Sequence, residues 1–211
     1  TYTDFAGRVT SFAYDNDQLL TGIDYPDGMA DVSYGYDAAG NITSMSDGLG
    51  STSYGYDVLN RLDTRTRNNR TVDYGYSAAN QVTSIDYWGQ GTVSYGYDNA
   101  GRLDHLTPWG GAATTYSYRS SGLLAGISRP NSVATTYSYD TASRLTGLTH
   151  VQGGSNTLNA IVYGLDANGN RVSLTDVDGL TTYVYDALNR LDVATYPAIP
   201  GGPPAATIYY S

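Results

Sequence analysis

Residues 34–43 read YGYDAAGNIT, and residues 95–104 repeat the pattern as YGYDNAGRLD. The motif begins with two tyrosines separated by one residue. Asp follows, then two variable residues, then Gly or Asn, then a polar residue and an aliphatic residue. Further copies occupy residues 54–63, 74–83, 116–125, 137–146 and 183–192, with degenerate copies at 12–20 and 163–172. Successive copies lie 20 to 22 residues apart, with one interval of 26. A period of this length indicates a repeat array whose unit is one small supersecondary element.

Each copy is expected to form a β-hairpin around a type I turn that is followed by a residue in the left-handed region. The Asp accepts hydrogen bonds from turn amides, and the fourth turn position needs a positive φ, which Gly adopts freely and Asn tolerates. Ser143 and the segment 17–18 depart from this rule. The predicted structural turn residues are Asp37, Gly40, Asp57, Asn60, Asp98, Gly101, Asp186 and Asn189.

The alternation of side chains along a strand predicts the register of the hairpin. Tyr36 should face Ile42 across the turn, and Tyr34 should face Ser44 on the same side of the sheet, with Met45 on the opposite side. The tyrosines of successive hairpins would then stack into two ladders. The structural repeat tyrosines are Tyr34, Tyr36, Tyr54, Tyr56, Tyr74, Tyr76, Tyr95, Tyr97, Tyr116, Tyr118, Tyr137, Tyr139, Tyr183 and Tyr185.

The composition predicts an all-β fold. All 20 acidic residues are Asp and all 11 basic residues are Arg, so the strong helix formers Glu and Lys are missing, while 25 residues are Gly and 22 are Tyr. About nine hairpins give roughly 18 strands, and a sheet that wide must coil. We therefore expect tandem hairpins in a spiralling β-sheet, which forms the wall of a shell, tube or filament.

Charge and composition exclude several functions. A net charge of −9 repels phosphate backbones, so nucleic acid is not expected as a partner. The chain contains no apolar run of about 20 residues, so insertion into a membrane is not expected. The chain lacks cysteine, which removes disulfides, thiolate metal sites and cysteine nucleophiles.

We expect residues 1–211 to form a single repeat array with partial repeats at both ends. The 26-residue interval, which contains Gly153, Gly154 and Ser155, and the Pro-rich segment 197–204 are interpreted as loop insertions. Thr1 is not Met, and both ends fall inside a repeat, so the chain is expected to be a processed product or a fragment. Its sheet edges should associate with copies of itself or continue into a longer repeat chain.

The motifs YGYDAAGNIT, YGYDNAGRLD and YVYDALNRLD (183–192), together with YPDG (25–28), closely resemble the YD repeats of bacterial Rhs proteins. Teneurins and the B and C components of insecticidal toxin complexes carry the same repeat. The resemblance implies a β-sheet that closes into a hollow cocoon around a toxic polypeptide cargo, or in teneurins a shell that supports cell adhesion. It also implies a secreted or cell-surface location. Residues 1–211 contain no segment that resembles the aspartyl autoprotease of cargo-releasing members, so we expect neither cleavage nor toxicity from this chain.

Few residues suggest chemistry. His105 and His150 are the two histidines, and no GxSxG motif accompanies the serines, so we expect no catalytic residues. The acid pairs at 15 and 17 and at 176 and 178 could serve a glycosidase or bind Ca²⁺, and the segment 166–170 resembles a calcium loop. The turn role of Asp nevertheless explains several of these acids, and residues 166–170 lie in phase with a hairpin turn. We expect no metal and no cofactor.

The sequence therefore predicts a non-catalytic structural scaffold. The alternative is a surface carbohydrate-binding or adhesion module that uses the tyrosine ladders, because aromatic faces stack on sugar rings. Known aromatic hairpin modules of this kind rely on Trp and Lys, whereas this chain has two Trp and no Lys. A third reading is an enzyme, which mutation of the paired acids would test.

Overall fold

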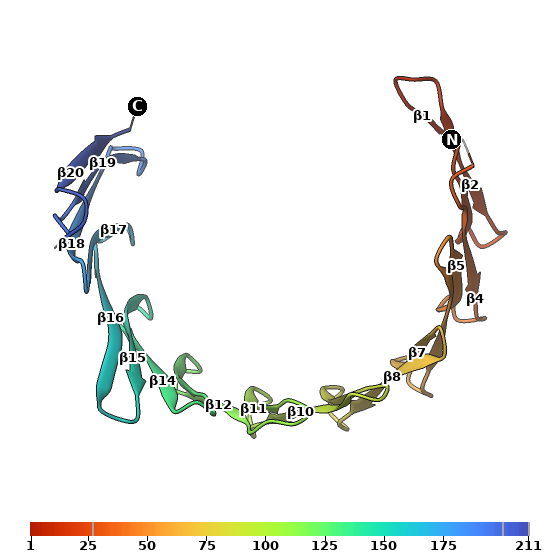
Figure 1. Cartoon of the computed structure of the whole chain (residues 1–211), viewed down its shortest axis with the longest axis horizontal. Coiled ribbons are helices and arrows are strands. Elements are labelled where there is room, and N and C mark those ends of the chain that lie inside the picture. Colours follow the sequence, from red (N-terminus) through yellow and green to blue (C-terminus); the bar gives the residue numbers. More distant parts are fainter. Residues whose placement is uncertain (27, 200, 211) are drawn as a thin grey trace. The chain divides into compact units, whose positions relative to one another are not determined.

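A computed structural model describes residues 1–211 except Asp27, Pro200 and Ser211, which belong to the predicted YPDG loop, the Pro-rich segment and the C-terminal partial repeat. The described residues contain 20 β-strands and no helix, which confirms the all-β fold of tandem hairpins (Figure 1). Accordingly, this part of the chain has no helix of the length and apolarity that crossing a membrane requires.

The chain divides into two compact units, and each is described by itself. The first unit consists of residues 1–96 and 107–110. Its strands are β1 (Tyr2–Thr3), β2 (Val9–Tyr14), β3 (Leu20–Asp24), β4 (Val32–Tyr36), β5 (Ile42–Asp47), β6 (Gly50–Tyr56), β7 (Leu62–Arg67), β8 (Arg70–Tyr76), β9 (Val82–Tyr87) and β10 (Gly91–Tyr97), the last residue of which belongs to the second unit.

The second unit consists of residues 97–106 and 111–211. Its strands are β11 (Leu103–Thr107, whose last residue belongs to the first unit), β12 (Thr114–Tyr118), β13 (Leu124–Ser128), β14 (Val133–Tyr139), β15 (Leu145–Gln152), β16 (Asn156–Leu165), β17 (Arg171–Asp176), β18 (Gly179–Tyr185), β19 (Leu191–Tyr196) and β20 (Ala206–Tyr209).

Successive strands pair antiparallel, from β1 to β10 in the first unit and from β11 to β20 in the second. The 26-residue interval does not form a longer loop. Instead, it lengthens β15 to 8 residues and β16 to 10 residues, and residues 153–155 form a tight turn at the tip. The insertion is therefore mostly strand, because residues on both sides of the turn continue the ladder out to the Gln152–Asn156 pair.

The predicted register is right for the inner tyrosine and wrong for the outer one. Tyr36 pairs with Ile42 as expected, but Tyr34 pairs with Met45 and not with Ser44. The cause is a β-bulge next to the turn, which leaves one extra residue on the second strand and shifts every later pair by one position. The same shift occurs in the hairpins of β6 and β7, β8 and β9, β12 and β13, β14 and β15, and β18 and β19.

In most hairpins the bulge places the residue between the two tyrosines in a pair that contains glycine, and Val184 opposite Val193 is an exception. Gly35 lies opposite Ser44, and a Cβ added to Gly35 would lie 2.5 Å from the Ser44 hydroxyl oxygen. In other hairpins the order is reversed, since Ser117 lies opposite Gly126 and the same holds for the Ser138–Gly147 pair. One glycine on either strand is enough to make room for the partner side chain.

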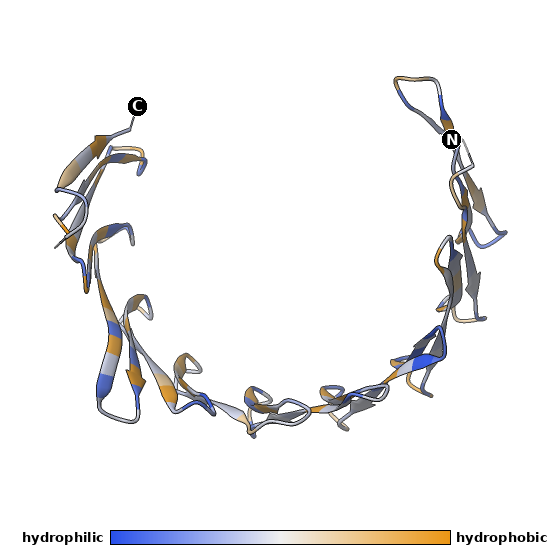
Figure 2. Ribbon diagram, in the orientation of Figure 1, coloured by the Kyte–Doolittle hydropathy of each residue, from blue (hydrophilic) through white to orange (hydrophobic). Residues whose placement is uncertain are grey.

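Burial is concentrated on the face that carries the tyrosines. The position two residues before the first tyrosine of each hairpin is β-branched, and four of these side chains are among the most buried of the described residues. They are Thr52, Val93, Thr135 and Thr181, which are 1%, 9%, 1% and 7% exposed. β-Branched residues pack well on a pleated surface, and they form a thin core here. Figure 2 shows the alternation of hydrophobic and hydrophilic residues along the strands.

Candidate functional site

The tyrosine-aspartate turn has the same geometry in most hairpins. In the turn at Asp37, one carboxylate oxygen accepts hydrogen bonds of 2.9 Å from the amides of Ala39 and Asn41. The amide of Gly40 donates to the Asp37 carbonyl at 3.0 Å, and Gly40 has a φ of +81°. At the equivalent position Asn60 has a φ of +58°. The positive φ also occurs at Gln18 and Ser143, the two copies that depart from the Gly or Asn pattern.

The residue after the positive-φ position closes the turn from outside. In the turn at Asp57, the Arg61 Nε donates a 2.7 Å hydrogen bond to the second carboxylate oxygen, and Asn41 does the same for Asp37 through its amide at 2.9 Å. The hydrogen bonds from the Arg61 side chain and backbone hold the pKa of Asp57 below its ordinary value. Arg102 acts in the same way on Asp98.

Among the described residues, the second tyrosine of six hairpins reaches back to the strand that precedes the hairpin. The hydroxyl of Tyr76 donates a 2.8 Å hydrogen bond to the carbonyl oxygen of Leu62, the first strand residue after the preceding turn. Burial raises the pKa of Tyr56 and Tyr76, which keeps these hydroxyls protonated as donors. The same bond, with a length of 2.7 to 3.0 Å, joins Tyr36 to Leu20, Tyr56 to Ile42, Tyr118 to Leu103, Tyr139 to Leu124 and Tyr185 to Arg171.

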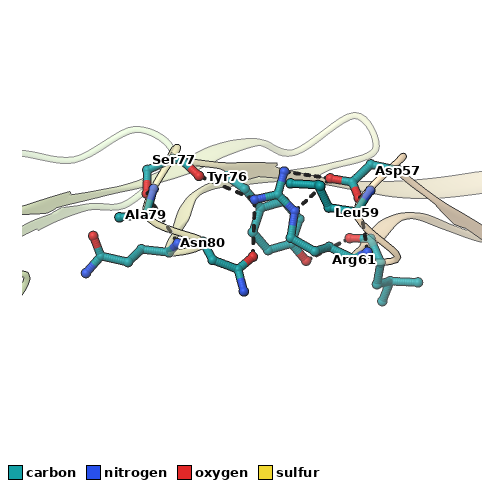
Figure 3. A network of polar contacts seen from close by, with 9 residues as sticks. Asp57, Leu59, Arg61, Tyr76, Ser77, Ala79 and Asn80 are labelled. Carbon is teal, nitrogen blue, oxygen red and sulfur yellow. Dashed lines mark hydrogen bonds and ion pairs between the residues drawn. The ribbon is translucent and has the colours of Figure 1, made fainter.

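Arginine forms the second half of this link between neighbouring hairpins (Figure 3). The Arg61 guanidinium lies 4.4 Å from the ring centroid of Tyr76, and its Nη1 donates to the carbonyl of Ser77 at 3.3 Å and to the Asn80 side chain at 3.2 Å. Arg102 stacks over Tyr118 at the same distance. We call the tyrosine bond and the stacked arginine together the inter-hairpin link. It joins an aspartate turn, a guanidinium and the next tyrosine in one continuous network.

Asparagine at the positive-φ position connects one turn to the next. Asn60 accepts a 3.3 Å hydrogen bond from the Asn41 amide. Asn80 accepts one from Arg61, and Asn189 accepts one of 2.8 Å from Asn170. Asparagine at this position therefore adds a contact between repeats that glycine lacks.

The structure places the second tyrosine of several hairpins and the neighbouring turn residues in this network. The structural role of the first tyrosines and the stacking of tyrosine rings into ladders stay predictions. Two contributors were missed by sequence reasoning, namely the Arg or Asn after the turn and the buried β-branched position. The sequence signal for both is positional. A side chain that donates hydrogen bonds recurs directly after the positive-φ position of most turns, as in Arg61 and Arg102. A Val, Ile or Thr recurs two positions before the first tyrosine, as in Thr52 and Val93.

The histidines and paired acids make local contacts. His105 lies 3.1 Å from the neighbouring Asp104, and the ring Nδ1 of His150 lies 2.9 Å from the Thr135 hydroxyl. Asp15 accepts a hydrogen bond from the amide of residue 17, and Asp176 accepts one from the amide of residue 178, so the first acid of each pair acts as a turn acceptor. The described residues contain no group of three or more His, Cys, Asp or Glu side chains that could hold a metal ion.

Two family models match the sequence. The model described as the teneurin YD-shell matches residues 2–127, which is more than half of the chain, and the model described as the RHS repeat matches residues 118–155 and 166–198. No curated protein matches the chain significantly.

Several solved structures share the fold. The crystal structure of TcdB2-TccC3 superposes with a TM-score of 0.72 at 19% identity, covering 90% of this chain and 12% of that chain. The structure of TcdB2-TccC3 without its hypervariable C-terminal region gives 0.72 at 18% identity, covering 92% and 12%. The structure of TcdB2-TccC3-Cdc42 gives 0.71 at 19% identity, covering 90% and 12%. The chain thus spans about an eighth of the length of the chains it matches.

Proposed function

Because this chain belongs to the teneurin YD-shell family, we propose that it is a non-catalytic wall segment of a secreted or cell-surface YD-repeat shell. The wall would join further repeats of a longer chain or other copies of itself through its sheet edges, and would enclose a polypeptide cargo. The family match and the fold shared with the toxin-complex structures support a structural shell scaffold.

The inter-hairpin link is the observation that carries this proposal. It recurs at neighbouring hairpins in both units and uses the side chains that an active site would otherwise offer, namely Asp, Arg, Asn and Tyr. The hairpins that carry the link are therefore fixed to their neighbours, and the stability of such an array is roughly a sum over neighbouring repeats. Repeated fixing of this kind suits a wall that must keep its curvature.

The same geometry argues against the tyrosine ladders as a sugar platform. The Tyr76 ring is covered by Arg61, and the Tyr118 ring by Arg102, each at 4.4 Å from the centroid. Their hydroxyls are bonded to the carbonyls of the preceding hairpins. These rings are half-buried, with one face covered and the hydroxyl occupied, so they offer little surface to a sugar ring.

Negative-stain electron microscopy with intact mass spectrometry on the same sample tests the assembly. We expect tubes, ribbons or hollow particles built from the 211-residue chain. Charged residues on edge strands block pairing, so Ile208→Lys with Tyr209→Lys in β20 should abolish assembly. Val177→Lys, at an exposed turn residue away from the edge strand, is the matched control. Dispersed monomers at every concentration, or assembly that survives the β20 changes, would contradict edge association.

A further inference from the structure

The hairpin of β7 and β8 concentrates arginine on one face of a strongly acidic protein. Arg67 lies directly opposite Arg70 in the strand pair, and Arg65 lies opposite Val72. Alternating positions share a face, so three guanidinium groups gather on the tyrosine-bearing side of this hairpin. Figure 2 shows the hairpin in strongly hydrophilic colour.

Only one carboxylate contacts these three arginines among the described residues. Asp47 accepts hydrogen bonds from the two terminal nitrogens of Arg67 at 2.7 and 3.2 Å, and Arg67 also donates to the Thr52 hydroxyl at 3.2 Å. The hydrogen bonds from Arg67 hold the pKa of Asp47 below its ordinary value. Arg67 and Arg70 lie directly opposite each other, and like charges in such a pair repel, so a ligand that brings negative charge would relieve the repulsion.

The acidic side chains of the neighbouring strands lie on the other face. Asp73 of β8 pairs with Asp86 of β9, and the Thr92 hydroxyl donates to Asp86 at 3.0 Å. These carboxylates alternate with the arginine face along the strand and do not neutralise it. The sheet therefore has a basic and an acidic side at this point.

The arginines line a cavity that continues beside a tryptophan. A cavity of about 450 Å³ is lined by Arg65, Arg67, Asn68, Arg70 and Val72. An adjoining cavity of about 330 Å³ shares Arg70 and Val72 and is lined further by Tyr87, Trp88 and Gln90. Both volumes fall in the range of small-ligand sites, of roughly 300 to 1,000 Å³.

Trp88 is open to a ligand. The residue is 57% exposed, although the Arg70 guanidinium lies over its ring at 5.7 Å from the centroid. The neighbouring Tyr87 is held edge-on by Trp109, with a distance of 5.2 Å between ring centroids. The aromatic part of the site thus has a supported ring and an accessible ring.

We propose that these two adjoining cavities bind an acidic saccharide, that is, a sugar ring that carries a carboxylate. Guanidinium groups bind carboxylates through paired hydrogen bonds, and here Arg65 and Arg70 supply them. The amide side chains of Asn68 and Gln90 donate and accept, as hydroxyl groups require. Trp88 offers an apolar face for the sugar ring. The site is distinct from the tyrosines of the inter-hairpin link and independent of whether the chain forms a wall.

The geometry favours a saccharide over other anions. A bound acidic peptide needs partners for its own backbone groups, but β8 is paired on one side with β7 and on the other with β9, so no free strand edge is available. Nucleic acid also stacks on aromatic rings, but a net charge of −9 repels its backbone.

Tryptophan fluorescence tests the proposal directly, because the chain contains two tryptophans. With selective excitation of tryptophan in the native chain, titration with trigalacturonate should give a saturable change in fluorescence that is lost in Trp88→Phe. The fully methyl-esterified trisaccharide, which has the same rings without charge, should bind at least tenfold more weakly. Binding should also weaken as salt is added.

Variants assign the binding to these side chains. Arg65→Gln combined with Arg70→Gln should weaken trigalacturonate binding at least tenfold. Arg171→Gln removes an arginine that stacks on Tyr163 in the second unit, and it should leave binding unchanged. Circular dichroism checks that each variant keeps its β-sheet. The proposal is overturned if the native chain shows no saturable binding up to about 10 mM, if hexa-aspartate binds as tightly as trigalacturonate, or if Arg171→Gln weakens binding equally.

Discussion

The hydroxyl of Tyr76 lies 2.8 Å from the carbonyl oxygen of Leu62, so the hairpin of β8 and β9 is tied to the backbone of the hairpin before it. The bond lies beyond the last backbone pair of β7 and β8, Thr64 with Asp73, and extends the contact between these strands toward the turns. It makes the tyrosine hydroxyl as important as the ring.

Tyr76→Phe should destabilise the chain by about 0.5 to 1.5 kcal/mol, the net value of a hydrogen bond that is lost with the ring retained. Urea denaturation followed by circular dichroism measures the change. Tyr74→Phe is the matched control, because Tyr74 is the first tyrosine of the same hairpin and the described residues show no hydrogen bond from its hydroxyl. Equal effects of the two variants would contradict the role of the inter-hairpin link.

Arg61→Lys should lower the thermal midpoint more than Arg190→Lys. Both arginines bond to the aspartate of their own turn through Nε at 2.7 Å, but Arg61 also stacks on the next tyrosine and its side chain is 19% exposed, against 75% for Arg190. Lysine cannot reproduce a planar fork that is stacked on a ring. Thermal unfolding by circular dichroism compares the two. A larger loss in Arg190→Lys would show that the turn, and not the link, carries the effect.

Gly40→Ala should destabilise the chain by about 1 kcal/mol, because φ is +81° there and a Cβ is unfavourable in the left-handed region. Gly40→Asn should cost less, since Asn60 occupies the same position in the next turn with a φ of +58°. The larger side chain is thus expected to be the better tolerated one. Chemical denaturation measures the free energy of unfolding of both variants. A smaller loss of stability in Gly40→Ala than in Gly40→Asn would refute the conformational explanation.

Gly35→Ser should be destabilising alone and should recover when Ser44→Gly is added. The two residues lie opposite each other, and the Ser44 hydroxyl fills the space where a Gly35 side chain would lie. The swapped order already exists at Ser117 and Gly126. A double-mutant cycle in urea measures the coupling. Additive effects of the two changes would mean that the pair does not share one space.

Acid should weaken the fold. The pKa of Asp57 and that of Asp98 are lowered in the folded state by hydrogen bonds from Arg61 and Arg102, relative to an ordinary value of 3.8. A lowered folded-state pKa contributes stability that is fully present above the unfolded pKa and is lost as the pH falls through the folded one. The thermal midpoint should therefore drop between about pH 5 and about pH 2.

Asp57→Asn supplies the control for the acid effect. It removes one titrating carboxylate, so the variant should start with a lower midpoint and lose less of it on acidification. A variant that loses as much as the native chain over the same pH range would show that Asp57 does not contribute to the acid sensitivity.

Local chemistry explains why so much of the fold could be predicted. The turn at Asp37 and Gly40 depends on residues within five positions of each other, so its acceptor and its positive φ follow from the sequence alone. The pairing of Tyr36 with Ile42 follows in the same way. The bulge that pairs Tyr34 with Met45 could not be predicted from the sequence. One extra residue on a strand leaves the alternation of side chains intact on either side of it.

The sequence by itself determined the repeat, the hairpin and the turn, because each is encoded within one unit of about 20 residues. Only the tertiary structure decided what the units do to each other. Arg61 reaches Tyr76 and Asn80 across 15 and 19 positions, and Arg67 meets Asp47 across 20. The gathering of Arg65, Arg70 and Trp88 around adjoining cavities likewise depends on how neighbouring strands are paired. Such contacts depend on the register between strands, and a single bulge is enough to change that register.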